Sequence, residues 1–401
     1  MQVLVFNSGS SSLRLKVLDS ENNVEYASCR FENIGGDGSY VKYENKVENK
    51  SFKDSFSGTF EDAVLDSLAY LTDDVLGLYH NLEDIQAIGH RIVQGKDKYV
   101  KPIVIDKNVL DEIIEFGADA PIHNLRSAKI IKMCLEEAKN PNNVGVFDTS
   151  FHSTIPKENF LYPIPSELYE NAGIRKFGFH GISYQNVMRT LPSILRKDRN
   201  DINAVLVHLG SGCSMCAIKD GKSFDTTMGY TPLDGLMMST RSGSVDPSVL
   251  PKICDYYNCD INKAIEILNT SSGYKGICGE SDVKTICDNS ENGDERATLA
   301  RFIASKSVKK NLGAMMAELG KVDAVVITGG MGVRNFRQRE LFLSDLEILG
   351  LALDKDKNKE CYNQTELISS DNSSIPIYVL PSDEEKEIAI QTDKTLKERA
   401  L

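Results

Sequence analysis

Two arginines lie among polar turn residues, where ligand-binding side chains are expected, and three of the six histidines are further candidates. Arg91 lies in GHRIVQG and Arg241 in MMSTRSGSVDP, each after an apolar segment. A guanidinium group is planar and matches the oxygens of carboxylate and phosphate. Either arginine can therefore bind a small oxyanion, and a structural ion pair is the alternative. His123, His180 and His208 lie in APIHNL, RKFGFHGIS and AVLVHLGSG.

One carboxylate follows a predicted strand, and another lies at the start of a predicted helix. Asp148 ends the apolar run VGVF, and ligands of open α/β sheets bind at the carboxyl ends of strands. It can hold Mg²⁺ or orient an attacking group, or it can cap the next turn. Glu384, in PSDEEKEIAI, can also serve a metal, although its pattern alone favours an acid in a first helical turn.

Three turns rich in small residues follow predicted strands, where backbone N–H groups can hold phosphate. The first lies in VLVFNSGSSSLRLKV and the second, about 200 residues later, in VLVHLGSGCSMCAIK. Each continues into a second strand, so both predict a β-hairpin with a small-residue tip. The shared pattern indicates an internal duplication. The third turn, in DAVVITGGMGVRN, precedes a predicted helix over 336–350.

The elements that would position these residues follow an α/β pattern. We expect strands and helices to alternate through the first 150 residues, with strands over 85–95 and 143–152. Residues 152–165 carry three prolines and little periodicity, so a linker or crossover is expected there. Apolar spacing predicts helices over 60–80, 108–117, 124–140 and 294–320 and at the C-terminal end of the chain.

Length and composition limit the class of protein. A chain of 401 residues is too long for one ordinary core, so two domains are expected. The net charge of −12 disfavours a nucleic-acid partner, which requires a basic face. Because no apolar stretch reaches the roughly 18 residues of a membrane span, and no secretion signal is visible, we expect a cytoplasmic protein without a membrane partner. Nine cysteines suit reduced thiols, and CSMC (213–216) is interpreted as strand residues, with a metal or redox motif as the alternative.

The motifs of two common enzyme classes are missing from the sequence. There is no G-x-S-x-G elbow and no GxxxxGK[ST] loop, so the chain is not a P-loop NTPase. The residues alone indicate a two-domain α/β phosphotransferase with three backbone phosphate cradles, and they leave its substrate open.

Seven segments, in this order, resemble the acetate kinase family, the acetate/propionate/butyrate carboxylate kinases of the actin–hexokinase–Hsp70 superfamily. The resemblance covers nearly the whole chain and implies duplicated ribonuclease-H-like α/β domains with an interdomain active-site cleft. The domains are expected at 1–150 and 151–384, with a C-terminal helix, about 385–401, packing back on the first. The segments are VFNSGSSSLRLKV (5–17), GHRIVQG (89–95), APIHN (120–124), VFDTSFH (146–152), KFGFHGIS (176–183), HLGSG (208–212) and DTTMGYTPLDGLMMSTRSGSVDP (225–247).

The resemblance assigns one group of residues to the phosphates, the nucleotide and the metal. Asn7 and Glu384 would hold Mg²⁺, largely through water, and Mn²⁺ is an alternative. The positions for phosphate and nucleotide are Asn7, Ser12, Arg14, His208, Gly210, Ser211, Gly212, Asp282, Val283, Lys284, Gly330, Met331 and Gly332.

A second group is assigned to the reacting carboxylate and phosphoryl groups. Arg91 and Arg241 would clamp them, and His180 would stabilise the phosphoryl charge with His123 assisting. Asp148 would orient the acetate oxygen. The pocket for the acetate methyl group would consist of Val93, Ile122, Phe179 and Pro232, beside Arg91.

The reaction implied is reversible, Mg²⁺-dependent in-line transfer of the γ-phosphoryl group of ATP to acetate, which gives acetyl phosphate and ADP. Acetate is already ionised at pH 7, so catalysis requires positioning and charge neutralisation rather than a strong base. The resemblance also implies a homodimer that forms through the second domain.

Departures from the family pattern concentrate near the phosphoryl donor. Gln94 and Lys96 stand where His and Gly are usual, and Ser211 stands where Asn is usual. Residues 328–334 lack the usual Glu and Asn, and Lys284 replaces an Arg that can stack on adenine. Pyrophosphate or phosphate is therefore the alternative donor. Propionate or butyrate can also be the acceptor, and the chain can instead be a non-catalytic sensor that binds acyl phosphate or nucleotide.

Overall fold

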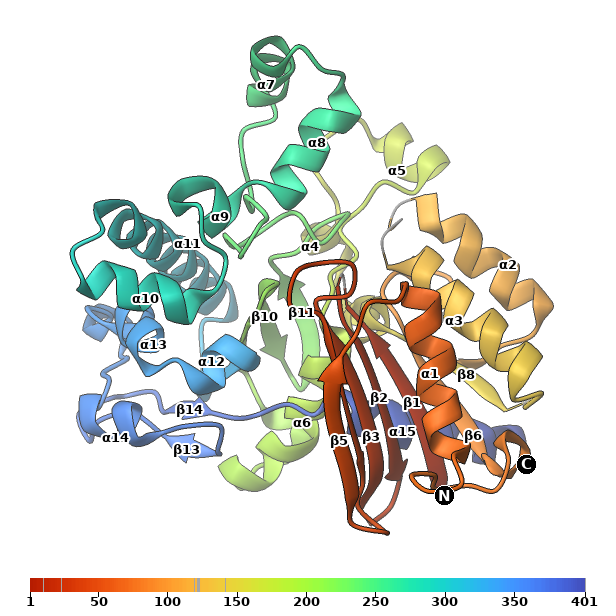
Figure 1. Ribbon diagram of the computed structural model, residues 1–401. Helices are drawn as coiled ribbons and strands as arrows, with labels where there is room; N and C mark the ends of the chain where they lie inside the picture. The colour runs from red at the N-terminus through yellow and green to blue at the C-terminus, as the bar shows by residue number, and fades with distance from the viewer. Residues whose placement is uncertain (10, 23, 119, 121–122, 141, 401) are drawn as a thin grey trace. The chain divides into compact units, whose positions relative to one another are not determined.

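The computed structural model describes the chain except for residues 10, 23, 119, 121–122, 141 and 401. The chain divides into two compact units, each with its own β-sheet (Figure 1). Unit 1 comprises Met1–Phe151 and Asp383–Leu401, and unit 2 comprises His152–Ser382.

The sheet of unit 1 combines an antiparallel meander with parallel strands. Its strands are β1 (Gln2–Ser8), β2 (Leu13–Asp19), β3 (Glu25–Glu32), β4 (Tyr40–Asn45), β5 (Lys50–Ser55), β6 (Ala87–Ile92), β7 (Ile103–Val104) and β8 (Asn143–Phe147). They run in the order β5-β4-β3-β2-β1-β6-β8-β7, with β1, β6 and β8 parallel. Because β1 to β5 are successive antiparallel neighbours, the expected alternation of strands and helices was wrong for residues 25–55. Strands β3 and β4 bury every second side chain most deeply, as expected of a sheet with one buried face.

Helices cover both faces of this sheet. They are α1 (Phe60–Thr72), α2 (Lys107–Glu115), α3 (Asn124–Glu137) and α15 (Glu384–Arg399), with 3₁₀ turns at Leu82–Asp84, Phe116–Ala118 and Asp148–Thr154. Helices α1 and α3 contribute to the apolar core that contains Leu4 and Phe6. Helix α15 lies against the opposite face, where a Cβ at Gly89 would be 2.8 Å from Ile388 Cγ2. Gly89 is in register with Val5, which points away from the Leu4 face because side chains alternate along a strand.

Helix α1 is shorter than the predicted 60–80. It starts at a capping box of Thr59 and Asp62 and ends at Thr72. The Asp73 carboxylate then accepts hydrogen bonds from the backbone N–H groups of Val75 and Leu76. Such a side-chain turn competes with helical hydrogen bonding, which explains the early end of the helix.

The sheet of unit 2 repeats the arrangement of unit 1. Its strands are β9 (Ala204–Leu209), β10 (Cys213–Lys219), β11 (Lys222–Thr226), β12 (Ala324–Thr328), β13 (Glu366–Leu367) and β14 (Ile377–Val379), in the order β11-β10-β9-β12-β14-β13. Strands β11-β10-β9 are antiparallel and β9-β12-β14 are parallel, and β3-β2-β1-β6-β8 show the same pattern in unit 1. Both predicted hairpins, β1–β2 and β9–β10, are confirmed. The repeat confirms the predicted duplicated α/β fold.

Most of unit 2 outside its sheet is helical, and helices α7 and α8 extend away from the strands (Figure 1). They are α4 (Lys157–Phe160), α5 (Ser166–Ala172), α6 (Gly181–Leu195), α7 (Val249–Tyr257), α8 (Ile261–Thr270), α9 (Gly273–Cys278), α10 (Val283–Glu291), α11 (Glu295–Leu319), α12 (Gly330–Arg334), α13 (Phe336–Leu343) and α14 (Lys355–Glu360), with 3₁₀ turns at Arg199–Asp201 and Glu347–Leu349. The long predicted helix over 294–320 is confirmed as α11. The predicted helix over 336–350 was too long, because Ser344 adopts an extended conformation and ends α13 at Leu343.

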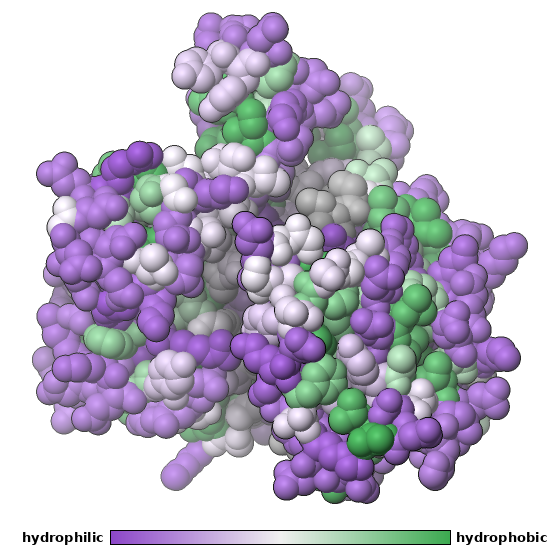
Figure 2. Space-filling model, in the orientation of Figure 1, coloured by the Kyte–Doolittle hydropathy of each residue, from purple (hydrophilic) through white to green (hydrophobic). Residues whose placement is uncertain are grey.

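The structure also places the CSMC motif, which lies outside the site. Cys213 and Cys216, the cysteines of CSMC, are buried residues of β10 with free thiols, so this motif is part of the strand. In the described part of the chain, no helix is both long and apolar enough to cross a lipid bilayer. The face drawn in Figure 2 is mainly hydrophilic, with hydrophobic side chains in small separate patches.

Candidate active site

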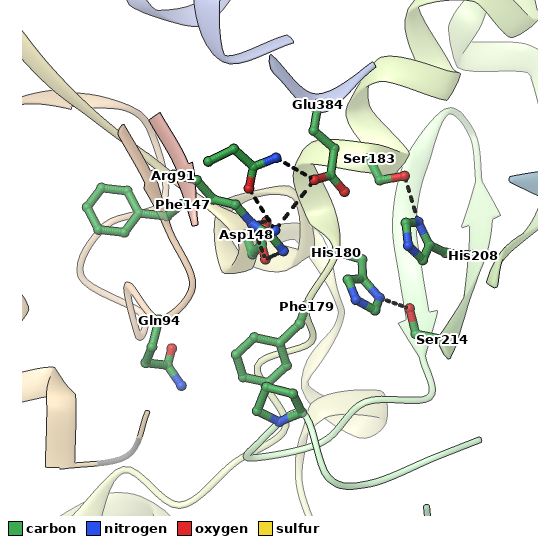
Figure 3. A network of polar contacts seen from close by, with 12 residues as sticks. Arg91, Gln94, Phe147, Asp148, Phe179, His180, Ser183, His208, Ser214 and Glu384 are labelled. Atoms are coloured by element: carbon green, nitrogen blue, oxygen red, sulfur yellow. Dashed lines mark hydrogen bonds and ion pairs between the residues drawn. The ribbon is translucent and has the colours of Figure 1, made fainter. Parts of the chain in front are cut away.

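In unit 1 an ion pair joins the ends of two neighbouring parallel strands. Arg91 lies in β6, and Asp148 directly follows β8. Arg91 Nη2 lies 2.7 Å from Asp148 Oδ2, and Nε donates to both carboxylate oxygens at 3.3 and 3.2 Å (Figure 3). The Asp148 side chain is 1% exposed and that of Arg91 is 16% exposed. This buried, forked contact fixes the position of the guanidinium group.

Asn7, near the end of β1, connects this pair to the start of α15. Its Oδ1 accepts a hydrogen bond from Arg91 Nη1 at 3.1 Å. Its Nδ2 donates to Glu384 Oε2 at 3.2 Å and to Glu385 Oε1 at 2.8 Å. Arg91 Nη1 also lies 3.5 Å from Glu384 Oε2. The ends of three strands and one helix therefore meet in a single polar cluster.

Several acids surround one guanidinium group in this cluster. Their charges and their burial shift the pKa values of Arg91 and Glu385. Burial alone lowers the pKa of Arg91, but the charges of Asp148 and Glu384 outweigh it and raise the pKa above its ordinary value. Burial raises the pKa of Glu385; the Lys16 ammonium group, 3.7 Å away, opposes this shift and Glu384 adds to it. Glu385 was not among the predicted residues. The sequence feature that could have indicated it is the acidic run DEEKE, in which Glu385 directly follows the predicted Glu384. Both carboxylates accept hydrogen bonds from Asn7.

Two further predicted residues of unit 1, the pocket residue Val93 and the catalytic candidate His123, lie in described segments. Val93 is buried one residue beyond that strand. His123 occupies the N-cap position of α3. Ile122 lies outside the described residues, so its place in the pocket stays a prediction.

Two predicted phosphate-binding residues lie at or next to the tip of the first hairpin. The carbonyl of Ser12 accepts a hydrogen bond from the backbone N–H of Gly9. Arg14 is directly opposite Asn7 in the β1–β2 register, so both side chains project to one face. Arg14 is exposed and lies 3.7 Å from Glu32 Oε1.

In unit 2 two histidines stack where β9 ends and α6 begins. The ring centroids of His180 and His208 are 4.2 Å apart, and their planes differ by 20° (Figure 3). A serine holds each ring: Ser214 Oγ lies 2.8 Å from His180 Nδ1, and Ser183 Oγ lies 2.8 Å from His208 Nδ1. Neither serine was predicted, since serines of this kind are common and only the fold brings them to the rings.

His180 has an unusual backbone conformation. Its φ of 59° and ψ of 19° are left-handed, which is uncommon for a residue other than glycine. The residue is the N-cap of α6, a helix of 15 residues. The imidazole therefore lies at the positive end of a helix dipole, which favours anions.

The tip of the second hairpin, Gly210–Gly212, brings His180 and Arg241 to one point. A Cβ at Gly212 would lie 3.1 Å from His180 Nε2 and 3.4 Å from Arg241 Nη1. The loop of Arg241 is attached to this tip because the Ser239 N–H donates to the carbonyl of Ser211 at 3.2 Å. An imidazole, a guanidinium group and a helix N-terminus thus converge, as expected around a phosphoryl group.

The predicted apolar residues of unit 2 adjoin these groups. Phe179 directly precedes the stacked histidine and is 1% exposed, and the Pro232 carbonyl accepts a hydrogen bond from Arg241 Nη1 at 3.3 Å. The buried His152 donates from Nε2 to the Phe179 carbonyl at 2.9 Å. Burial lowers the pKa of His152 to about 4, so it acts here as a neutral ring. His152 supports the backbone of the pocket and was not predicted, although it ends the motif VFDTSFH.

The residues predicted for the nucleotide come from α10 and from the turn after β12. Asp282 caps α10, Val283 is buried and Lys284 is exposed. The predicted Gly330, Met331 and Gly332 form the first part of α12, and Gly329 alone separates this helix from the end of β12. The two segments adjoin, because Cys287 Sγ of α10 lies 3.8 Å from Asn335 Oδ1.

Two predicted metal-binding residues of unit 1, Asn7 and Glu384, carry oxygen atoms. Mg²⁺ prefers oxygen ligands and usually takes only one or two carboxylates, with water and substrate phosphates completing its shell. The oxygens that these residues carry are Asn7 Oδ1, which accepts a hydrogen bond from Arg91 Nη1, and the Glu384 carboxylate, which accepts one from Asn7 Nδ2. No group of three or more His, Cys, Asp or Glu side chains that could enclose a metal occurs among the described residues.

The fold and the site together define a class of protein. Each unit has the same five-strand order and a hairpin whose end carries a polar ligand-binding candidate, Asn7 or His208. This is a duplicated ribonuclease-H-like α/β protein in which each unit places an arginine and other polar side chains beside its first hairpin.

Comparisons with known proteins identify the family. The model of the acetokinase family matches residues 2–390. The chain is 39% identical over 400 residues to the acetate kinase of Helicobacter acinonychis, which covers 99% of this chain and 100% of that protein. Among solved structures, an acetate kinase from Porphyromonas gingivalis has a TM-score of 0.88 at 35% identity, over 98% of this chain and 99% of that one. A propionate kinase from Francisella tularensis has a TM-score of 0.89 at 35% identity over the same shares. The chain belongs to the acetokinase family, as its motifs predicted.

Proposed function

We propose that this chain is a kinase that transfers the γ-phosphoryl group of ATP to acetate, giving acetyl phosphate and ADP, and that it also runs the reverse reaction. The observation that carries the proposal is the convergence of His180 Nε2 and Arg241 Nη1 on Gly212. Together with the N-terminus of α6, these groups suit the three equatorial oxygens of a phosphoryl group in transfer. The family match over the whole length supports the same conclusion.

The residues of unit 1 receive the carboxylate. Acetate is ionised at neutral pH, so the attacking oxygen needs no base. Arg91 supplies positive charge for this anion, and Asp148 holds its guanidinium group in place through three hydrogen bonds of 2.7 to 3.3 Å. Asp148 is therefore a positioning residue. It acts as a charged partner of Arg91 and does not need to accept a proton during the reaction.

The residues of unit 2 stabilise the charge that spreads over the phosphoryl oxygens. A carboxylate oxygen forms a bond to the γ-phosphorus while the bond to the ADP oxygen breaks, and no proton is transferred. His180 and Arg241 donate hydrogen bonds to the equatorial oxygens throughout. The Ser214 contact holds the His180 ring in place for this role.

Magnesium fits the donors of unit 1. Asn7 and Glu384 would hold it, and it would supply charge neutralisation at the phosphates.

A homodimer is the proposed assembly, with a second copy of the chain as the partner. Leu299, Phe302 and Ile303 of α11 are 54%, 52% and 40% exposed. Their spacing places them on one face of the helix, and Ile261 and Ile265 of α8 are also at least 40% exposed. We expect Phe302→Asp to convert a dimer into a monomer, as measured by light scattering after size-exclusion chromatography. A wild-type monomer would refute the assembly.

The activity is tested by acetyl phosphate formation from acetate with Mg²⁺ and ATP, GTP or pyrophosphate. We expect turnover with ATP. Turnover with pyrophosphate alone would refute the donor, and no turnover with any donor would refute the kinase. Propionate should also be a substrate, because one methylene in an apolar pocket changes discrimination by only about 1–3 kcal/mol.

A further inference from the structure

Gln94 carries a buried amide nitrogen that makes no hydrogen bond to any residue that the structure describes. The side chain lies two residues beyond β6 and is 0% exposed. Its Nε2 has no hydrogen-bond partner within the described residues, and no dashed line reaches it in Figure 3. Because an unpaired buried donor destabilises the folded state, such groups in native proteins usually have a function or a partner that arrives later.

The orientation of this amide is settled by the neighbouring backbone. Gln94 Oε1 accepts a hydrogen bond from the N–H of Lys96 at 2.9 Å. Lys96 has a left-handed φ of 52°, so this bond closes a tight turn. If the amide were flipped, Gln94 Nε2 would face the Lys96 N–H, and two donors would be in contact. The oxygen therefore faces Lys96, and Nε2 is the atom that has no partner among the described residues.

The loop of Gln94 is anchored beside the Arg91–Asp148 pair. Its backbone N–H donates to Asn124 Oδ1 at 2.9 Å, and Asn124 Nδ2 donates to its carbonyl at 2.8 Å. The next backbone N–H, that of Gly95, donates to Thr149 Oγ1 at 3.1 Å. Thr149 directly follows Asp148, so the loop that carries Gln94 lies at the edge of the sheet where β6 and β8 both end.

We propose that Gln94 is a positioning and specificity residue whose Nε2 donates a hydrogen bond to a carboxylate oxygen of the acyl acceptor. The inference rests on the proposed function and adds to it a residue outside the predicted site residues. A carboxylate oxygen is a strong acceptor, and it would satisfy the donor that the described residues leave unpaired. Arg91 would then bind the acceptor by charge, and Gln94 would fix its orientation.

Two substitutions separate this role from support of the Lys96 turn. Gln94→Met removes both the donor and the turn acceptor, whereas Gln94→Glu retains an acceptor for the Lys96 N–H and places a negative charge where the donor was. We expect the KM for acetate to rise roughly ten- to a hundredfold in Gln94→Met and further in Gln94→Glu, with kcat changed less than about threefold. If Gln94 only supports the turn, the order reverses: Gln94→Glu resembles the wild type, and Gln94→Met lowers the unfolding midpoint. That order, or an unchanged KM in both variants, overturns the proposal.

Thr392→Val serves as the matched control. It removes a buried hydroxyl of unit 1 that also lacks a partner among the described residues, but on α15 and on the opposite face of the sheet from Leu4. We expect no change in the KM for acetate. A wild-type chain without kinase activity would refute the proposed function, and acetate binding measured by calorimetry would then test Gln94 directly. Weaker binding in both Gln94 variants would support it, and equal or absent binding would overturn it.

Discussion

Removing the Arg91 guanidinium should destabilise unit 1 as well as stop the reaction. In Arg91→Ala the Asp148 carboxylate, 1% exposed, loses its cation, and Glu384 and Glu385 remain nearby. Breaking a buried ion pair by removing one partner costs about 3–5 kcal/mol. Typical domains have a free energy of unfolding of about 5–15 kcal/mol, so the variant should fold but unfold at a clearly lower urea concentration.

A second variant, Asp148→Asn, allows the coupling energy between Asp148 and Arg91 to be measured. Asp148→Asn removes the buried negative charge, while Arg91 keeps Asn7 and Glu384 as partners. We therefore expect a smaller loss for Asp148→Asn, and a double variant that is more stable than the sum of the two losses implies. For groups in direct contact the coupling should be about 2–3 kcal/mol.

The assay is urea denaturation followed by circular dichroism for the wild type, both single variants and the double variant. All three variants should also lose most acetyl phosphate formation. Additivity of the two losses within about 0.5 kcal/mol would refute the argument that this pair is energetically coupled. An Arg91→Ala variant as stable as the wild type would refute the magnitude.

Three further outcomes are expected. Arg241→Ala should lower kcat/KM for acetate by at least about a hundredfold with an unchanged circular dichroism spectrum, and retained activity would contradict its role at the hairpin tip. Burial lowers the pKa of His90 to about 4, against about 6.5 in an unfolded chain. Unfolding therefore takes up a proton between these values, and the free energy of unfolding should fall by up to about 3 kcal/mol as the pH is lowered from 6.5 to 4. His90→Phe should flatten this slope in urea midpoints measured across the range, and an identical slope would exclude His90 as its cause. Gly329 has a φ of +79°, and an added Cβ would lie 2.5 Å from the Leu209 carbonyl oxygen. Gly329→Ala should cost more than about 2 kcal/mol in thermal unfolding, whereas Gly330→Ala, whose Cβ would meet nothing closer than 3.9 Å, should be nearly neutral in stability.

Local patterns were sufficient to predict several elements. The two strand–turn–strand segments became the hairpins β1–β2 and β9–β10, because a strand with one buried face must alternate in polarity and a small-residue turn permits the reversal. The 25-residue helix α11 was also predictable from its unbroken spacing and the absence of proline. Helix ends were less predictable, since at Asp73 and Ser344 a local turn or an extended residue, rather than the apolar pattern, decides where helical hydrogen bonding stops.

Sequence by itself therefore determined the family, the duplicated α/β class and the residue types of the site, because these depend on motifs whose spacing along the chain is short. Only the tertiary structure brought Asn7 within hydrogen-bonding distance of Glu384 and Glu385, 377 and 378 positions away. It alone showed that Gly212 faces both His180 and Arg241. The physical reason is that such contacts are set by strand register and by helix packing over long separations, and no local pattern encodes which ends of which strands will share one edge of a sheet.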